Sequence, residues 1–154
     1  MIEVTELVKD SVNEFEVLWS SLRVGSFEWD ASKCLKFVSS VTSHFRTCNV
    51  LNRFGVYVIR SHATQSVVYI GKGGTIATDG RFKEQDIPKR LKAERDKKIS
   101  GNAWFAYLYK KHGRLVIEYA FTQAIPKSPA LLEAELMKTF LNRFRRLPDE
   151  NKAF

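Results

Sequence analysis

The chain has 154 residues, of which 44% are hydrophobic and 27% charged, so it holds enough apolar material for one domain with a sizeable core. Its two cysteines are too few for a disulfide framework, and it has no run of about eighteen apolar residues that could span a membrane. The N-terminus lacks the basic stretch and apolar run of a secretory signal, so we expect a cytoplasmic protein without membrane contact.

The positive charge is unevenly distributed along the chain. In total 25 Lys and Arg stand against 17 Asp and Glu, a formal net charge of +8. Residues 1–52 carry 5 of the basic and 7 of the acidic side chains, net −2, whereas residues 53–154 carry 20 and 10, net +10. This charge favours a polyanionic partner, because basic side chains that neutralise phosphates release condensed counterions. The alternative is a set of solvated lysines on helix surfaces.

Two amphipathic helices are expected in residues 1–52. Apolar residues recur at spacings of three and four over residues 4–20. A second helix is expected from Ala31 to Phe45, with Asp30 as its N-cap. The negative charge of this part argues mildly against phosphate contact. We interpret it as an N-terminal helical extension that serves as a packing layer or as the contact of a homodimer, and the oligomeric state stays open.

The pattern changes to that of β-strands after Arg53. Phe54 to Arg60 and Ser66 to Ile70 are rich in β-branched and aromatic residues and flank a short polar segment. This arrangement predicts an antiparallel hairpin. Residues 71–85 contain several glycines and are expected to form a long loop.

Two helices are expected after this loop. Asp86 is a suitable N-cap for the first, which tolerates Pro88 in its first turn and is expected to continue toward Lys98. Asn102 is expected to cap the second, and Gly113 to end it.

The remainder of the chain predicts one more strand and one more helix. Leu115 to Thr122 alternates between apolar and polar residues well enough for a third strand. Ser128 and Pro129 form a favourable N-cap and N1 pair for a final helix. The expected fold class is therefore α+β, a small three-stranded antiparallel sheet flanked by helices.

Two short segments of the expected hairpin resemble a known family. Gly55-Val56-Tyr57 and Tyr69-Ile70-Gly71 are similar to the paired strands that open the GIY-YIG nuclease domain. The resemblance covers about residues 53–154, a GIY-YIG-like nuclease domain, and implies a metal-dependent endonuclease that cuts phosphodiester bonds, with double-stranded DNA as the expected partner.

The resemblance extends to two later segments. Ile87-Pro88-Lys89-Arg90-Leu91 is similar to the family's helix with a phosphate-binding arginine, so Arg90 takes that role, and Arg81 in the preceding loop is its rival. The family's segment with the metal-binding glutamate is matched by Leu131-Leu132-Glu133-Ala134-Glu135-Leu136-Met137-Lys138. In this match Glu133 is the metal ligand, whereas Glu135 lies on another face of the helix. A family-like asparagine near a proline is matched by Asn151 after Pro148.

The resemblance implies a role for each catalytic candidate. Tyr57 is the first choice and Tyr69 the second for the group that activates a water molecule, and Lys72 supplies positive charge. Arg90 would stabilise charge on the phosphate oxygens, and Glu133 would hold one Mg²⁺ or Mn²⁺. The expected nucleic-acid contacts are Gly71, Lys72, Gly73, Arg81, Lys89 and Asn151.

Other interpretations remain open at this point. Tyr57 and Tyr69 could be ordinary strand aromatics, and Arg90 could form an ion pair with Glu94. The domain could bind nucleic acid without cutting it, or it could cut RNA. A nucleotide-hydrolysing phosphate loop is disfavoured, because residues 71–75 lack the required order of glycine, four residues, glycine, lysine and serine or threonine.

Overall fold

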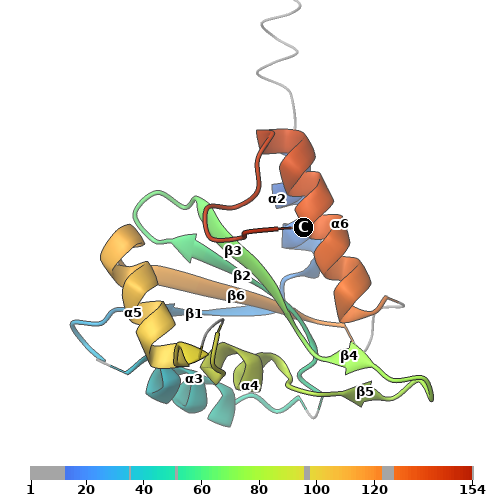
Figure 1. The fold of residues 1–154 in the computed structure, drawn as a ribbon, viewed down its shortest axis with the longest axis horizontal. Coiled ribbons are helices and arrows are strands. Elements are labelled where there is room, and N and C mark those ends of the chain that lie inside the picture. The colour runs from blue at the N-terminus through green and yellow to red at the C-terminus, as the bar shows by residue number, and fades with distance from the viewer. Residues whose placement is uncertain (1–12, 35, 51, 96–97, 123–126, 154) are drawn as a thin grey trace, which may run out of the picture.

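The structure is a computed structural model that describes residues 13–34, 36–50, 52–95, 98–122 and 127–153. Its centre is a four-stranded antiparallel sheet in the order β1-β6-β2-β3, with helices on both faces (Figure 1). The strands are β1 (Gly25–Trp29), β2 (Gly55–Ser61), β3 (Val67–Gly73) and β6 (Leu115–Phe121).

Each face of the sheet has its own apolar core. Helices α2 (Glu14–Leu22) and α6 (Pro129–Phe144) cover one face, and α3 (Phe37–Arg46), α4 (Ile87–Lys92) and α5 (Gly101–His112) cover the other (Figure 1). The three layers follow from the sequence of β2, in which all residues are buried. Val56 and Val58 face the α2 and α6 side, whereas Tyr57 and Ile59 face the opposite core.

The sheet has four strands, so the expectation of three was wrong. The three expected strands are present, and β1 adds a fourth at the edge, where Gly25 to Trp29 pair with Tyr119 to Leu115 of β6. Phe27 packs against the core that contains the buried Trp29, while Ser26 and Glu28 are exposed. Residues before Arg53 therefore belong to the sheet, while the division into an extension and a nuclease domain stays a prediction.

A buried ionic network also connects the N-terminal segment to the sheet. Arg60 of β2 lies 2.7 Å from Glu118 of β6 and 2.7 Å from Glu16 of α2. Glu118 accepts a further hydrogen bond from Trp19 Nε1 at 2.9 Å and pairs with Arg23. Both ends of α2 are thus held to the sheet by charged partners.

The expected helices of the first 52 residues need correction at their boundaries. Asn13 caps α2, which ends at Leu22, and the earlier part of the expected helix over residues 4–20 lies outside the described residues. The helix expected from Ala31 begins only at Phe37. Asp30 is not its cap, because its carboxylate accepts from the backbone nitrogen and hydroxyl of Ser32 and so closes a turn.

The long loop expected over residues 71–85 is also partly wrong. β3 continues to Gly73, and two-residue strands β4 (Thr75–Ile76) and β5 (Phe82–Lys83) pair in a small hairpin. The helix after it is shorter than expected. α4 ends at Lys92, and the backbone nitrogen of Arg95 donates to Ile99 O at 2.7 Å instead of continuing the helix.

Most of the expected helix boundaries in the second half are confirmed. Asp86 caps α4, Ser128 caps α6, and Gly113 ends α5 with a φ of 78°. Asn102 was the wrong cap for α5, because Ser100 accepts from Ala103 N. The Asn102 side chain instead accepts from Val38 N at 2.9 Å and joins α5 to α3. No helix among the described residues is long and apolar enough to cross a membrane.

Candidate active site

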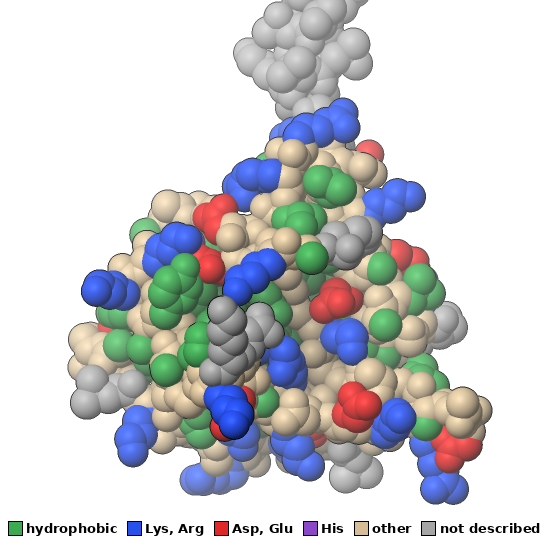
Figure 2. Space-filling model, viewed as in Figure 1, with side chains coloured by type: hydrophobic (Ala, Val, Ile, Leu, Met, Phe, Trp, Pro, Cys, Tyr) green, Lys and Arg blue, Asp and Glu red, His purple; other side chains and the backbone are tan. Residues whose placement is uncertain are grey.

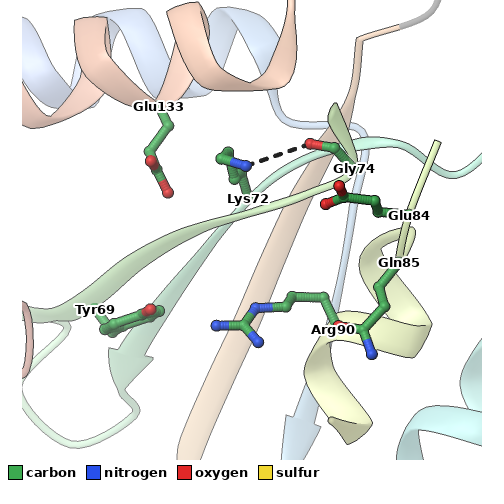
Figure 3. Close-up of a pocket in the computed structure, with 7 residues that line it drawn as sticks. All are labelled: Tyr69, Lys72, Gly74, Glu84, Gln85, Arg90 and Glu133. Atoms are coloured by element: carbon green, nitrogen blue, oxygen red, sulfur yellow. Dashed lines mark hydrogen bonds between the residues drawn. The ribbon is translucent and has the colours of Figure 1, made fainter. Parts of the chain in front are cut away.

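A cavity of about 620 Å³ opens where β3, the β4–β5 hairpin, α4 and α6 meet. Its polar lining brings together four of the five expected catalytic residues (Figure 3). These are Tyr69 and Lys72 from β3, Arg90 from α4 and Glu133 from α6. Gly74, Glu84 and Gln85 complete the wall. Residues more than sixty positions apart in the chain therefore converge on one space.

Gly71 sets the arrangement of the two tyrosines. It lies opposite Tyr57 in the β2–β3 register, two positions after Tyr69. A Cβ atom at Gly71 would lie 2.5 Å from the Tyr57 hydroxyl oxygen and 2.8 Å from a ring carbon of Tyr69. The Tyr57 ring thus crosses β3 over Gly71, with its centroid 6.0 Å from that of Tyr69. Any side chain at position 71 would displace both rings.

The two tyrosines differ in their access to the cavity. Tyr57 is fully buried, and its hydroxyl oxygen accepts a hydrogen bond from Arg95 Nη1 at 3.2 Å. Tyr69 is partly exposed and lines the cavity. Of the two phenols, Tyr69 is therefore the one that a substrate in the cavity can contact.

The environment keeps Tyr69 protonated. The electrostatic effect of the Tyr57 phenol and then burial raise the pKa of Tyr69 well above 10, while Arg95 and Arg90 act in the opposite direction. At neutral pH Tyr69 is thus a neutral phenol, which can donate one hydrogen bond and accept others.

Lys72 and Gly73 have different places at the end of β3. The Lys72 ammonium lies within 3.5 Å of Gly74 O, at the cavity wall (Figure 3). Gly73 is buried, and a Cβ atom there would lie 2.5 Å from the backbone nitrogen of Ile87. The absence of a side chain at Gly73 lets the start of α4 approach β3, which sets the distance of Arg90 from the cavity.

Helix α4 distinguishes Arg90 from the other basic candidates nearby. Asp86 Oδ1 accepts from Lys89 N at 3.1 Å, and Ile87 and Leu91 are buried beneath the helix. This anchoring points Arg90 toward the cavity and leaves Lys89 exposed. Arg81 lies in the turn between β4 and β5, where its side chain is 87% exposed and 3.7 Å from Asp79. It does not line the cavity.

Glu133 begins the second turn of α6, between buried neighbours. Leu132 and Leu136 pack into the core, and Glu133 faces the cavity beside them. Burial raises the pKa of the Glu133 carboxyl, while Lys72 and Arg90 partly oppose the shift. In the described part of the chain, no hydrogen bond or ion pair occupies its carboxylate. Glu135, in contrast, pairs with Lys127 at 2.8 Å.

The donor set around Glu133 fits a hard divalent cation bound with its substrate. Within the described residues, no three His, Cys, Asp or Glu side chains gather as a metal-binding group. Mg²⁺ needs no such cage, since it is commonly held by one or two carboxylates, water and substrate phosphates. The half-buried Glu133 carboxylate, without a protein donor, meets that requirement for oxygen ligands.

Both polar atoms of the Asn151 side-chain amide form hydrogen bonds at the outer edge of β3. Its Oδ1 accepts from Ile70 N, and its Nδ2 donates to Ile70 O, both at 2.9 Å. Glu150 N donates to Val68 O at 2.9 Å. The C-terminal tail therefore pairs with the backbone on both sides of Tyr69, and Asn151 acts here as a positioning residue for that strand.

Sequence reasoning missed two charged residues of this region. Glu84 lines the cavity with a φ of 68°, at the end of the β4–β5 hairpin. Arg95 contacts the tyrosines from beyond α4. Neither had a sequence signal, because one lay in an expected loop and the other in an expected helix.

Comparison of the chain with protein-family models, curated proteins and solved structures finds no match in any of the three. Function is therefore inferred from the cavity and from the sequence pattern.

Proposed function

We propose that the protein is a cytoplasmic, divalent-metal-dependent endonuclease with a GIY-YIG-type domain over about residues 53–154. Its substrate would be the phosphodiester backbone of DNA. The observation that supports this most strongly is the meeting of Tyr69, Lys72, Arg90 and Glu133 at one cavity. All four are among the residues that the GIY-YIG resemblance implies from the sequence alone.

The cations of the cavity suit a phosphodiester. A planar guanidinium such as that of Arg90 can donate two parallel hydrogen bonds to phosphate oxygens and stabilise the charge that develops on them. Lys72 adds a second positive charge on the opposite wall. Both residues are fixed by ordered elements, so little reorganisation is needed when the substrate enters.

Glu133 would hold one Mg²⁺ or Mn²⁺ together with oxygen atoms of the substrate and water. When bound, the metal would neutralise phosphate charge and stabilise the leaving 3′ oxygen. Burial raises the pKa of Glu133, and Lys72 and Arg90 oppose that shift only in part, so a bound cation would further favour the ionised carboxylate.

Tyr69 is assigned to the proton transfer, in place of the buried Tyr57. The oxygen of a water molecule bonds to phosphorus while the bond from phosphorus to the 3′ oxygen breaks. A neutral phenol both donates and accepts, so Tyr69 can take the proton of the water while it passes its own proton to a phosphate oxygen, from which a proton moves to the leaving 3′ oxygen to give a hydroxyl. This relay needs no phenolate, which agrees with the raised pKa of Tyr69.

The surface charge supports a polyanionic substrate. In Figure 2, Lys and Arg side chains border the hollowed face and gather along its lower edge, over α3 and α4. Lys89 and Arg81 are exposed on the two elements that frame the cavity. A nucleic-acid backbone that enters the cavity would thus meet positive charge on its flanks.

The proposal is tested by digestion of supercoiled plasmid, a branched DNA and single-stranded RNA, each with Mg²⁺ and with EDTA. Cleavage of DNA that requires the metal and is lost in Glu133→Gln is expected. The matched control is Glu135→Gln, which removes a carboxylate two residues away on the same helix. Binding without cleavage of any substrate would favour a non-catalytic module, and cleavage of RNA alone would change the substrate class.

A further inference from the structure

A second cavity, of about 220 Å³, adjoins the candidate active site. Tyr69 and Arg90 line both cavities, so the two spaces meet at these side chains. The far wall of the second cavity consists of Arg95, Ile99, Trp104 and the tail residues 150–153. A polymer whose reacting group lies beside Arg90 can therefore continue into this space.

Arg95 has an unusual environment in the wall of this cavity. Its guanidinium carbon lies 4.4 Å from the centroid of the Trp104 ring, and its Nη1 donates to Tyr57. Its Nε and Nη2 are enclosed and have no hydrogen-bond partner, and no described carboxylate lies within ion-pair distance. An enclosed cation with unused donors is costly, so an anion that supplies the missing acceptors would be bound favourably.

The other charges of the cavity also favour an anion. Its cations are Arg90, Arg95 and Lys152, and its acidic residue is Glu150. The Glu150 carboxylate is engaged on another side, where Lys111 donates to it at 2.9 Å. The balance at the cavity is thus positive, and the aromatic face of Trp104 holds the guanidinium fork of Arg95 in place.

We propose that this second cavity binds the phosphodiester next to the one that is cut, with Arg95 as its anchoring cation. The proposal rests on the nuclease function assigned above. The enclosed nitrogen atoms of Arg95 gain acceptors when the guanidinium turns on the Trp104 face as the phosphate enters. A strand with successive phosphates at Arg90 and Arg95 is thereby fixed in register, and a substrate without the second phosphate binds more weakly.

The test uses duplex oligonucleotides in which one phosphate at a time is replaced by a neutral methylphosphonate. Dissociation constants are measured by fluorescence anisotropy in EDTA, and the bond that is cut is mapped in parallel with Mg²⁺. For the parent protein, neutralising one phosphate adjacent to the cut bond is expected to weaken binding about tenfold. Arg95→Met is expected to bind the unmodified duplex about tenfold more weakly and to show no further loss at that position.

Two further variants make the result specific. Arg81→Met removes the same charge from the β4–β5 hairpin, outside the second cavity, and is expected to keep the full sensitivity to that methylphosphonate. Arg95→Lys keeps the charge without the fork and should retain part of the sensitivity, which gives a second measurement if Arg95→Met does not fold. Equal sensitivity in the parent, Arg95→Met and Arg95→Lys would overturn the subsite even if cleavage is observed. If the parent does not cleave but the coupling between Arg95 and one phosphate is found, the subsite stands and the nuclease function fails.

Discussion

Replacing Glu133 by glutamine should separate metal binding from folding. Burial raises the pKa of Glu133, so the folded chain holds the proton of this carboxyl more tightly than the unfolded chain does. Above this raised pKa, the ionised carboxylate therefore lowers the stability of the fold. The loss of stability disappears as the pH falls through the raised pKa of Glu133 and the carboxyl takes up its proton. Without metal at neutral pH, Glu133→Gln should be at least as stable as the parent, and the difference should vanish in acid.

Bound metal should reverse the order of stability of the parent protein and Glu133→Gln. A cation at one hundred times its dissociation constant stabilises a one-site protein by about 2.7 kcal/mol, or about 5–10 °C in Tm for a domain of this size. Glu133→Gln should lose most of this shift, and its cleavage rate should fall about a hundredfold or more. Glu135→Gln should keep both, because Glu135 pairs with Lys127 instead of facing the cavity.

The measurement is a thermal melt of the three proteins with EDTA and across a Mg²⁺ or Mn²⁺ titration, together with single-turnover cleavage. Equal metal-dependent shifts in the parent and Glu133→Gln would refute the assignment of Glu133 as the ligand. A large loss of shift in Glu135→Gln would move the assignment to that residue.

Three other outcomes are expected. Arg90→Lys keeps the charge but loses the forked guanidinium, so its single-turnover rate at saturating substrate should fall about a hundredfold. Arg81→Lys should change the affinity for DNA more than the rate. The opposite pattern would place the catalytic arginine in the β4–β5 hairpin. The logarithm of DNA affinity should fall with the logarithm of salt concentration at a slope of about −0.9 for each phosphate contact, and a flat titration would contradict backbone binding. Burial alone would raise the pKa of Glu118, but the hydrogen bonds and the charge of Arg60 outweigh burial, so the pKa is lowered. The pair of Glu118 and Arg60 therefore stabilises the fold above the pKa of the unfolded carboxyl. This stability is lost as the pH falls through the pKa of the folded state. Glu118→Gln should cost about 3 kcal/mol in urea unfolding at neutral pH and remove that pH dependence, and an unchanged unfolding midpoint would show that the network is not stabilising.

The parts of the fold that sequence predicted are those with a local cause. The strands of the hairpin are runs of β-branched and aromatic residues, and Ser128 with Pro129 marks the start of α6. The strand from Gly25 to Trp29 was missed, since it pairs with β6 about ninety residues later and is only five residues long. The β4–β5 hairpin has strands of two residues, too short for any periodicity to appear.

The candidate site was predicted in outline for the same reason. Local patterns selected Arg90 and Glu133, and the cavity brings both together. The sequence ranked Tyr57 before Tyr69, but the pattern could not tell which one is accessible, because two aromatic strand residues look alike until the neighbouring elements are placed. Tyr57 is covered by the helices of one layer, and only Tyr69 reaches the cavity. Arg95 depends on a turn after α4 that no local signal announces.

The tail that pairs with β3 has a consequence for the behaviour of the protein in solution. An edge strand with free backbone groups is a template for pairing with another chain, and proteins avoid this by covering such edges. Asn151 and Glu150 satisfy backbone groups of Ile70 and Val68 on that edge. The residues that hold Tyr69 in place thus also shield the sheet from self-association. A defect in this tail would first be noticed as aggregation during expression, and the displacement of Tyr69 at the candidate site would be hidden behind it.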